Sequence, residues 1–411
     1  MAPVIWKFGE IREEIRVYSL NPNNDIFNDY RLKFLINNRQ IKLDYLYTSN
    51  SSKLFSFLFG NLICKYGLNT HKYLLTNIIF VYVRWFISKI FRFLLYRIFR
   101  INISHVISKI YDFDWVEDIL IKNKPSILIF DHASHPKLYN VGSILKVAKK
   151  MKIPTIDIPH GIPLFVEHPH QWDKAKKNLV AFKKDHTVLH HKWWKKELIE
   201  FGLDPKNTPI LGSPRFCKDW VKIINEILPY DDSLNNMNNE KLKVVYMEMG
   251  GTNDANAEII EDTIKRISEL DFINLIIKPQ TRSNRLLLRE NPDNIYIARN
   301  ENSVNLVKWA DVVLVLFSSI MIEALIQKKT YIYPKYMHDG EMIYEEYGAC
   351  WTVNSYKELE MALLKKYKKR NYQPYSNDNV NQFLNEAIFN GFVQKDILNN
   401  YVDYISDIAK Y

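Results

Sequence analysis

The segment 311–336 carries the sharpest chemical pattern in the sequence. An apolar, β-branched run ends at Phe317, and Ser318 and Ser319 follow it at the start of a helical pattern. Ligands of open parallel sheets bind beyond the carboxyl ends of strands, where a helix start offers free N–H groups and a positive dipole to a diphosphate. The two hydroxyls add donors, and Glu323, one turn into the helix, can accept from a ribose hydroxyl. Plain helix capping explains the same residues equally well.

A basic turn follows the expected strand 272–280. Lys278, Gln280 and Arg282 stand at or just beyond the carboxyl end of that strand. Arginine gives a planar, bidentate phosphate clamp and lysine a point charge, so this turn suits an anionic donor. The alternative is a solvated basic loop.

Two further turns complete the expected donor site. Gly250 and Gly251 follow the expected strand 243–251, where glycine lets the backbone approach a ligand closely. Arg215, in GSPRF at 212–216, precedes a polar linker and can reach a cleft between two domains. An ordinary turn and an ordinary surface arginine are the alternatives.

Histidines are concentrated in one part of the sequence. Eight of the 11 histidines lie there: His132, His135, His160, His168, His170, His186, His190 and His191. Asp131, His132 and His135 follow the expected strand 125–130, and His160 follows the expected strand 154–159, so these four should face one cleft. A transfer that inverts the anomeric carbon needs a base for the acceptor hydroxyl. Asp131 and His160 are the candidates, with His132 and His135 as helpers or stabilisers of the leaving group.

A metal site is not expected. The runs HASH (132–135) and HPH (168–170) offer imidazoles, but neither is a standard helical ligand pair such as HExxH. The three cysteines, Cys64, Cys217 and Cys350, are far apart, which favours a reducing compartment without structural disulfides.

The elements that position these residues alternate between strand and helix. Between 125 and 216 and again between 243 and 336, short apolar runs alternate with helical spacing, which predicts parallel sheets with crossover helices. The expected divisions are an N-terminal acceptor-binding domain (1–227), an Asn-rich linker (228–241), a donor-binding domain (242–377) and C-terminal helices that pack back on the N-terminal domain (378–411).

The order of these motifs resembles the GT-B glycosyltransferases, and more closely the bacterial surface-polysaccharide transferases and the CDP-glycerol glycerophosphotransferase group. The likeness covers roughly 120–350 and consists of PHG (159–161), GSPRF (212–216), the Gly-Gly turn, the basic turn and SSxxxEAL (318–325). The glycerophosphotransferases usually carry Lys-x-His-Pro in the basic turn. This chain has KPQTR at 278–282, which leaves the donor open.

The resemblance implies two Rossmann-like domains whose parallel sheets face a central cleft. It implies an inverting, metal-independent transferase without a cofactor, in which the helix start holds the phosphates of a nucleotide-activated sugar and Glu323 holds the ribose. The acceptor would be a lipid-linked bacterial surface glycan, such as a capsule or lipopolysaccharide precursor. An acidic sugar such as Kdo is among the candidate donors.

Composition and charge are compatible with this assignment. The 411 residues suit two domains, and 47% hydrophobic with 25% charged residues is a globular balance. The net charge of +10 fits nucleic acid, an anionic membrane face or a phosphorylated substrate. No nucleic-acid-binding motif is present, and the N-terminus has no apolar core of a secretory signal, so a cytoplasmic protein is expected.

The basic, aromatic segment 74–100 is the part of the sequence that could interact with a membrane. Five cations interrupt it, at Arg84, Lys89, Arg92, Arg97 and Arg100. Each would cost about 2.5–3.5 kcal/mol near the centre of a bilayer, which disfavours a transmembrane helix. A helix lying on the inner face of the cell membrane and a buried core helix with cations at its edge both fit the pattern.

Three other functions agree with parts of the same sequence pattern. Alditol-phosphate transfer from a CDP-activated donor and sugar-nucleotide epimerisation on the same fold use the same donor half. A basic protein that binds membrane or nucleic acid without catalysis is the alternative from a different class.

Overall fold

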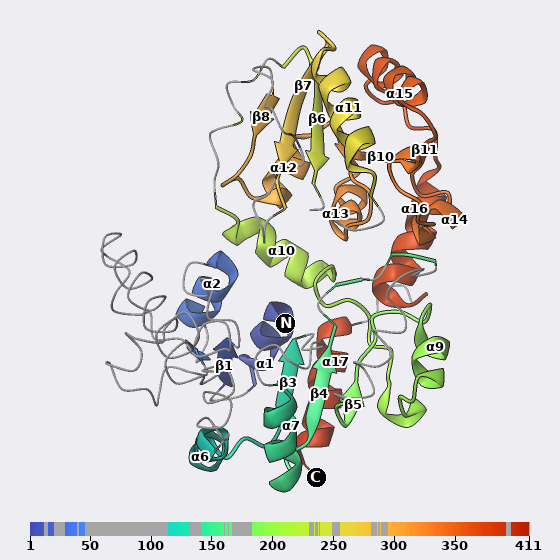
Figure 1. Cartoon of the computed structure of the whole chain (residues 1–411). Helices are drawn as coiled ribbons and strands as arrows, with labels where there is room; N and C mark the ends of the chain where they lie inside the picture. The colour runs from blue at the N-terminus through green and yellow to red at the C-terminus, as the bar shows by residue number, and fades with distance from the viewer. Residues whose placement is uncertain are drawn as a thin grey trace, which may run out of the picture.

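The computed structural model describes residues 1–11, 15–19, 29–38, 41–45, 114–131, 141–159, 161–162, 164–166, 183–229, 234, 237, 239–248, 255–280, 286, 288, 295–391 and 396–410. In this part of the chain two α/β units lie one above the other, and helix α10 (Lys218–Ile227) crosses between them (Figure 1).

The C-terminal unit contains a parallel sheet of six strands in the order β11-β10-β9-β6-β7-β8. Its strands are β6 (Leu242–Met247), β7 (Ile273–Lys278), β8 (Ile295–Ile297), β9 (Val312–Leu314), β10 (Thr330–Pro334) and β11 (Trp351–Val353). The order reverses between β6 and β9, as in doubly wound dinucleotide-binding sheets, and ligands of such sheets bind outside the carboxyl ends at that point.

Helices cover both faces of this sheet because alternate strand residues point to opposite sides. On one face α11 (Ala257–Ser268) and α15 (Tyr356–Lys368) pack over Val244 and Leu275. On the other face α12 (Ser303–Trp309) and α13 (Ile320–Ile326) pack over Val245 and Val313. Strands buried on both faces read as continuous apolar runs, which is why the sequence predicts them well.

The N-terminal unit holds a parallel sheet in the order β3-β4-β5 and a separate parallel pair, β1-β2. Its strands are β1 (Ile15–Ser19), β2 (Ile41–Tyr45), β3 (Leu128–Asp131), β4 (Thr155–Ile158) and β5 (His186–Thr187). Its helices are α1 (Ala2–Phe8), α2 (Tyr30–Asn38), α6 (Asp114–Asn123), α7 (Val141–Lys150) and α9 (Lys195–Glu200).

The strand expected within 208–216 is wrong. That segment makes one parallel bridge, between Leu189 and Ile210. Pro209 and Pro214 lack a backbone N–H, and Gly212 has a left-handed backbone (φ 88°), so a longer ladder cannot form.

The remaining helices complete the connections. They are the 3₁₀ turns η2 (Pro205–Asn207) and η3 (Lys335–Met337), α14 (Ile343–Glu346), α16 (Asn377–Leu384), the π-helical turn η4 (Asn385–Phe389) and α17 (Ile397–Ala409). Helix α16 packs against α13 of the C-terminal unit, whereas α17 packs against α1 of the N-terminal unit. The C-terminal residues therefore contact both units.

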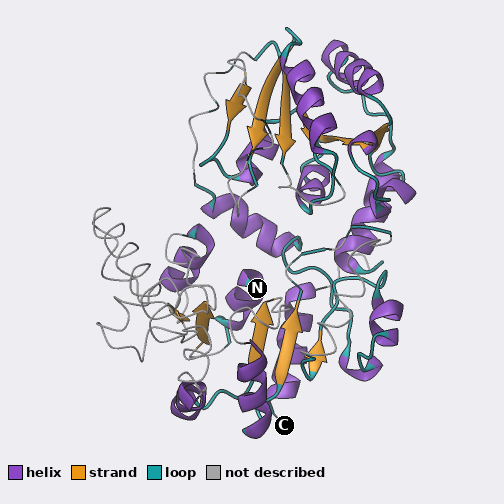
Figure 2. Ribbon diagram, viewed as in Figure 1, coloured by secondary structure: helices purple, strands orange, loops and turns teal. Residues whose placement is uncertain are grey.

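Both sheets direct the carboxyl ends of their strands toward the boundary between the units, as the arrowheads in Figure 2 show. A loop of the N-terminal unit pairs with the C-terminal unit across this boundary. The Val166 amide donates to the Glu341 carbonyl (3.0 Å), and the Ile343 amide donates to the Leu164 carbonyl (2.8 Å). Phe165 packs on Phe317, the residue before the serine pair, with ring centroids 5.2 Å apart. The units are thus in direct contact beside the expected donor site.

Among the described residues, no helix is long and apolar enough to span a bilayer. The segment 74–100 lies outside the described residues.

At Gly212 the segment before α10 passes very close to the backbone of η4. A Cβ added there would lie 2.6 Å from the Ile388 carbonyl oxygen, and the backbone φ of 88° is in the left-handed region. We therefore expect Gly212→Ala to lower the free energy of unfolding by about 2 kcal/mol or more. Urea unfolding would measure this. Gly161→Ala, where an added Cβ meets nothing within 4 Å, is the matched control. Equal stability of the two variants would contradict the close approach.

His191 makes stability depend on pH. Its side chain is 4% exposed, its ring packs on Trp193 with centroids 4.2 Å apart, and neither ring nitrogen has a hydrogen-bond partner. Burial lowers the pKa of His191 to about 3. Below its ordinary pKa the unfolded chain binds a proton that the folded chain excludes, so the free energy of unfolding falls as pH decreases.

We expect this loss between about pH 6.5 and pH 3, on the order of 1 kcal/mol per pH unit for this residue. His191→Phe keeps an aromatic ring on Trp193 and removes the titration. Its urea-unfolding midpoint should change less steeply with pH than that of the wild type. Parallel pH profiles would show that His191 does not carry this dependence.

Candidate functional site

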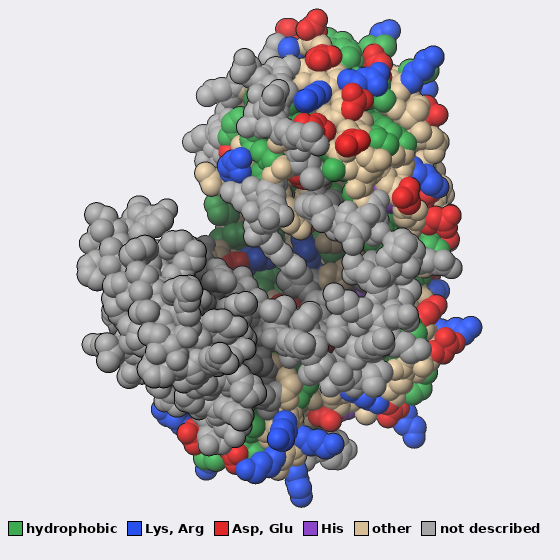
Figure 3. Space-filling model, in the orientation of Figure 1, with side chains coloured by type: hydrophobic (Ala, Val, Ile, Leu, Met, Phe, Trp, Pro, Cys, Tyr) green, Lys and Arg blue, Asp and Glu red, His purple; other side chains and the backbone are tan. Residues whose placement is uncertain are grey.

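The carboxyl ends of three strands bring predicted site residues to the boundary. Asp131 is the last residue of β3, Lys278 is the last residue of β7, and Ser318 and Ser319 follow β9. His132, His135, His160, Gly250, Gly251 and Arg282 lie outside the described residues, so their predicted roles stay predictions. Figure 3 shows Lys or Arg and Asp or Glu side chains together in the recess between the two units.

Arg215 connects the two units at the start of α13. Its guanidinium donates from Nη1 to the Ser319 Oγ at 3.4 Å, although the two residues are 104 positions apart. Arg215 is exposed to solvent. Partial burial and the nearby Arg31 lower the pKa of Arg215, and the Glu323 carboxylate opposes this shift. An accessible cation in a recess is well suited to bind an anionic ligand.

The serine pair starts α13 as the sequence predicts, and its two hydroxyls have different partners. Ser319 is the N-cap residue, but its side chain accepts no capping bond and faces Arg215 instead. The Ile320 amide donates to the Ser318 Oγ at 3.4 Å, a long and weak bond. Ser318 thus contributes capping, while Ser319 contributes to the recess between the units.

Glu323 lies one turn into α13. Its side chain is buried, with 9% exposed, and its Oε1 accepts from the Gln327 Nε2 at 2.7 Å. Its charge opposes the lowering of the Arg215 pKa, and it lies one helical turn after Ser319. The three side chains supply a charged donor, a neutral hydroxyl and an acceptor, which is a set that can bind both a phosphate and a sugar hydroxyl.

Lys278 has a partner within the protein. The ammonium is buried, with 6% of the residue exposed, and it donates to the Arg299 carbonyl at 3.0 Å. Burial lowers its pKa, and the Glu301 carboxylate opposes the shift. This hydrogen bond holds the segment after β8 in place. A ligand could accept only from the remaining N–H groups of the ammonium. Gln280 lies two residues farther along, on the loop after β7.

Arg31 is a functional candidate that sequence reasoning missed. It lies on α2, and its Nε donates to the Asp29 Oδ1 at 3.0 Å, which orients the guanidinium. Its charge affects Arg215. The segment 1–70 gives no readable alternation, so no sequence signal placed this residue at the boundary.

His190 is the second missed candidate. It follows β5, is 5% exposed, and neither ring nitrogen has a hydrogen-bond partner. Burial, His191, the Met1 amine and Arg215 lower the pKa of His190 to about 3, and Asp131 opposes the shift. Asp131 and Arg215 are thus among the charged groups that affect the pKa of His190. The only sequence signal was its membership of the histidine-rich stretch.

Asp131 is partly exposed at the carboxyl end of β3 in the N-terminal sheet. Its side chain is 37% exposed, and its Oδ2 lies 4.0 Å from the Met1 amine. A carboxylate at this position gives the N-terminal side of the recess a group that can accept a proton or a hydrogen bond.

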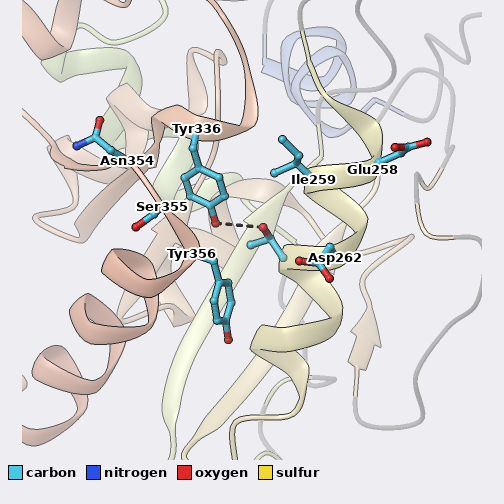
Figure 4. Close-up of a pocket in the computed structure, with 8 residues that line it drawn as sticks. Glu258, Ile259, Asp262, Tyr336, Asn354, Ser355 and Tyr356 are labelled. Carbon is cyan, nitrogen blue, oxygen red and sulfur yellow. Dashed lines mark hydrogen bonds between the residues drawn. The ribbon is translucent and has the colours of Figure 1, made fainter.

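A hollow of about 500 Å³ lies away from these residues, between α11 and the start of α15 (Figure 4). Two tyrosines and the carboxylates Glu258 and Asp262 line it, and the Tyr336 hydroxyl is 3.1 Å from the Thr263 Oγ1. Two carboxylates repel a diphosphate, so this hollow does not compete with the recess as a donor site. Among the described residues, no group of three or more His, Cys, Asp or Glu could hold a metal ion.

No protein-family model matches the sequence, and no curated protein matches it. Similar solved structures include S. aureus MnaA with UDP, with 12% identity, coverage of 98% of each chain and a TM-score of 0.53. Another is the UDP-GlcNAc 2-epimerase from Neisseria meningitidis bound to UDP-GlcNAc, with 11% identity, coverage of 99% of this chain and 96% of that one, and a TM-score of 0.52. The UDP-N-acetylglucosamine 2-epimerase from Rickettsia bellii has 14% identity, coverage of 96% and 97%, and a TM-score of 0.50. At these identities the likeness shows the fold alone, and it confirms the predicted GT-B-like arrangement of two α/β units with parallel sheets.

Proposed function

We propose that the chain is a glycosyltransferase that moves a sugar from a nucleotide-activated donor to a lipid-linked bacterial surface glycan. The observation that carries the proposal is the contact of Arg215, from one unit, with Ser319 at the carboxyl end of β9 in the other. A ligand in this recess would touch both units at the switch point of a doubly wound sheet.

The donor's diphosphate would be bound by Arg215 and the Ser319 hydroxyl. Glu323, next to them and buried, would accept from a ribose hydroxyl. Lys278 and Gln280 would add donors along the same edge of the sheet. Arg282, Gly250 and Gly251 remain in the proposal from the sequence. The expectation of free amides at the start of α13 is wrong, because the amides of Ile320, Met321 and Ile322 donate to the Ser318 Oγ, the Ser318 carbonyl and the Ser319 carbonyl.

The transfer would proceed in one displacement. The acceptor oxygen attacks the anomeric carbon, its proton passes to a base, and the bond from that carbon to the phosphate oxygen breaks. The electron pair leaves with the nucleoside diphosphate, whose charge Arg215 offsets. No metal or cofactor is part of this proposal.

Asp131 is the preferred base, with His160 as the other candidate and His132 and His135 as helpers. His190 is not a base candidate. Both ring nitrogens are buried, and a pKa of about 3 keeps the imidazole neutral at pH 7.

Epimerisation of a sugar nucleotide is the second candidate function. Two of the similar solved structures are UDP-N-acetylglucosamine 2-epimerases, and their similarity to this chain extends over both units. Alditol-phosphate transfer from a CDP-activated donor uses the same recess, with attack on phosphorus. A position of the segment 74–100 on the membrane surface would favour the transferase, because an epimerase needs no lipid-linked acceptor. A location on the inner face of the cell membrane belongs to this proposal.

Two measurements separate these functions. Thermal shift against UDP, CDP, CMP and their sugar conjugates identifies the donor, since a ligand that binds only the folded chain raises the Tm. Product analysis of the best donor, with and without a lipid-linked acceptor, then distinguishes the reactions. A new sugar nucleotide formed without acceptor indicates an epimerase. No response to any nucleotide would contradict both enzymes and favour a non-catalytic basic protein.

We expect Arg215→Met to weaken binding of the donor nucleotide by at least about tenfold, because a charge-assisted contact to phosphate is lost. Glu323→Gln should weaken binding several-fold less, through the ribose. Titration calorimetry would measure both. Arg266→Met is the matched control, because its guanidinium lies over Tyr356 on the outer face, 3.5 Å from the ring centroid. Equal affinity of the Arg215 variant and the control would remove the phosphate site from the recess.

We expect Asp131→Asn to lower kcat by about 10²–10⁴-fold and to leave donor affinity nearly unchanged, because Asn keeps the shape of the side chain and cannot take a proton. Steady-state kinetics with the identified donor and acceptor would test this. Turnover at the wild-type rate would assign the base elsewhere, with His160 next to be replaced.

A further inference from the structure

A basic hollow lies at the end of the C-terminal unit that is opposite the recess. The start of β9, the start of β10 and the end of α15 form it, and its volume is about 290 Å³. The strands run from this end toward the recess (Figure 1), so the two sites are at opposite ends of one sheet.

The hollow has a surplus of positive charge. Lys328, Lys329, Lys366 and Arg370 line it, against the single carboxylate of Asp311. That carboxylate is already used, because its Oδ2 accepts from Arg370 Nη1 (2.5 Å) and from the Lys243 amide (3.0 Å). One carboxylate among four cations leaves a net charge of about +3, which attracts anions to this hollow.

The two central lysines are held in place by neutral groups. Lys366 Nζ donates to the Tyr372 carbonyl (3.1 Å), and Lys329 Nζ donates to the Lys308 carbonyl (2.6 Å). A carbonyl satisfies one N–H but does not neutralise the charge, and each ammonium has three donors. Lys366 is only 7% exposed, so its charge is unfavourable without an anion. Burial lowers the pKa of Lys366, as do Arg370 and Lys329, while Asp311 opposes the shift.

We infer that this hollow is a binding site for a phosphate monoester, separate from the recess between the units. A dianion offsets most of the surplus charge, whereas a single carboxylate leaves it mostly uncompensated. The lysines supply point charges with unused donors, and Arg370 is fixed by Asp311 and by the Glu240 carbonyl (2.6 Å). The volume suits a phosphate group with a small attached part better than a whole nucleotide.

Inorganic phosphate, added to the full chain at constant ionic strength, is the first probe. We expect it to raise the Tm of the wild type by about 2 °C or more, and Lys366→Met to lose this response. Lys365→Met is the matched control on the same helix, because Lys365 is exposed and donates to the Tyr372 hydroxyl instead. The control should keep the full response. An unchanged phosphate response in Lys366→Met would overturn the site.

Lys328→Glu provides a second test that does not depend on a buried substitution. Lys328 is exposed, so the variant should fold, and reversing its charge should weaken phosphate binding several-fold. Its response to the nucleotide that binds the recess should stay unchanged, which separates this site from the proposed donor site. Phosphate binding of wild-type strength in this variant would also overturn the inference.

Vesicles identify the source of the phosphate. Co-sedimentation with phosphatidylcholine vesicles that contain phosphatidic acid, lost in Lys328→Glu and competed by phosphate, would assign the site to a lipid headgroup. A phosphate response without such co-sedimentation would assign it to a soluble phosphate ester. Absence of both effects in the wild type would refute the site.

Discussion

The position of the candidate site depends on the close backbone packing at Gly212. The Ser213 amide donates to the Ile388 carbonyl at 2.8 Å, and the Tyr401 hydroxyl donates to the Gly212 carbonyl at 2.9 Å. These bonds fasten the segment before α10 to the C-terminal helices, which contact both units. Arg215 follows three residues later, so the same packing determines where its guanidinium can reach. A residue with a Cβ at 212 could not make this approach, because the Ile388 oxygen would lie within 2.6 Å of it.

Three sites on the surface differ in their charge and therefore in the ligands that suit them. The recess combines Arg215 and Arg31 with the carboxylates of Glu323 and Asp131, a mixture suited to a ligand with both phosphate and hydroxyl groups. The hollow in Figure 4 is acidic and aromatic, and the hollow at the far end of the sheet is basic. In the recess, cations and acceptors from the two units meet. A net charge of +10 averages over these sites and cannot distinguish them.

The fold class and most buried strands could be predicted from the sequence, because apolar runs such as 244–247 and 312–316 are buried on both faces of a parallel sheet. The start of α13 could be predicted because a serine pair follows one of these buried runs. The short strand β11 was not predicted, since Trp351–Val353 is too brief to show a period. Helix α15 was missed although it has 13 residues and begins at the N-cap Ser355. The contact of Arg215 with Ser319 is a tertiary fact across 104 residues, and no local pattern encodes it. The sequence shows His190 only as one of eight histidines in one stretch. Its low pKa comes from burial, which depends on tertiary packing.

The distinction between a transferase and an epimerase lies in the N-terminal unit. Both reactions need the nucleotide held at the carboxyl ends of β6 and β9, and a fold shared with epimerases therefore does not choose between them. What would differ is the group that faces the sugar and the space left for an acceptor. The described N-terminal residues contribute the partly exposed carboxylate of Asp131. A carboxylate that solvent can reach is also one that an acceptor hydroxyl can reach. The accessibility of Asp131 thus fits deprotonation of an incoming acceptor, and it is the feature of the described site that best fits transfer.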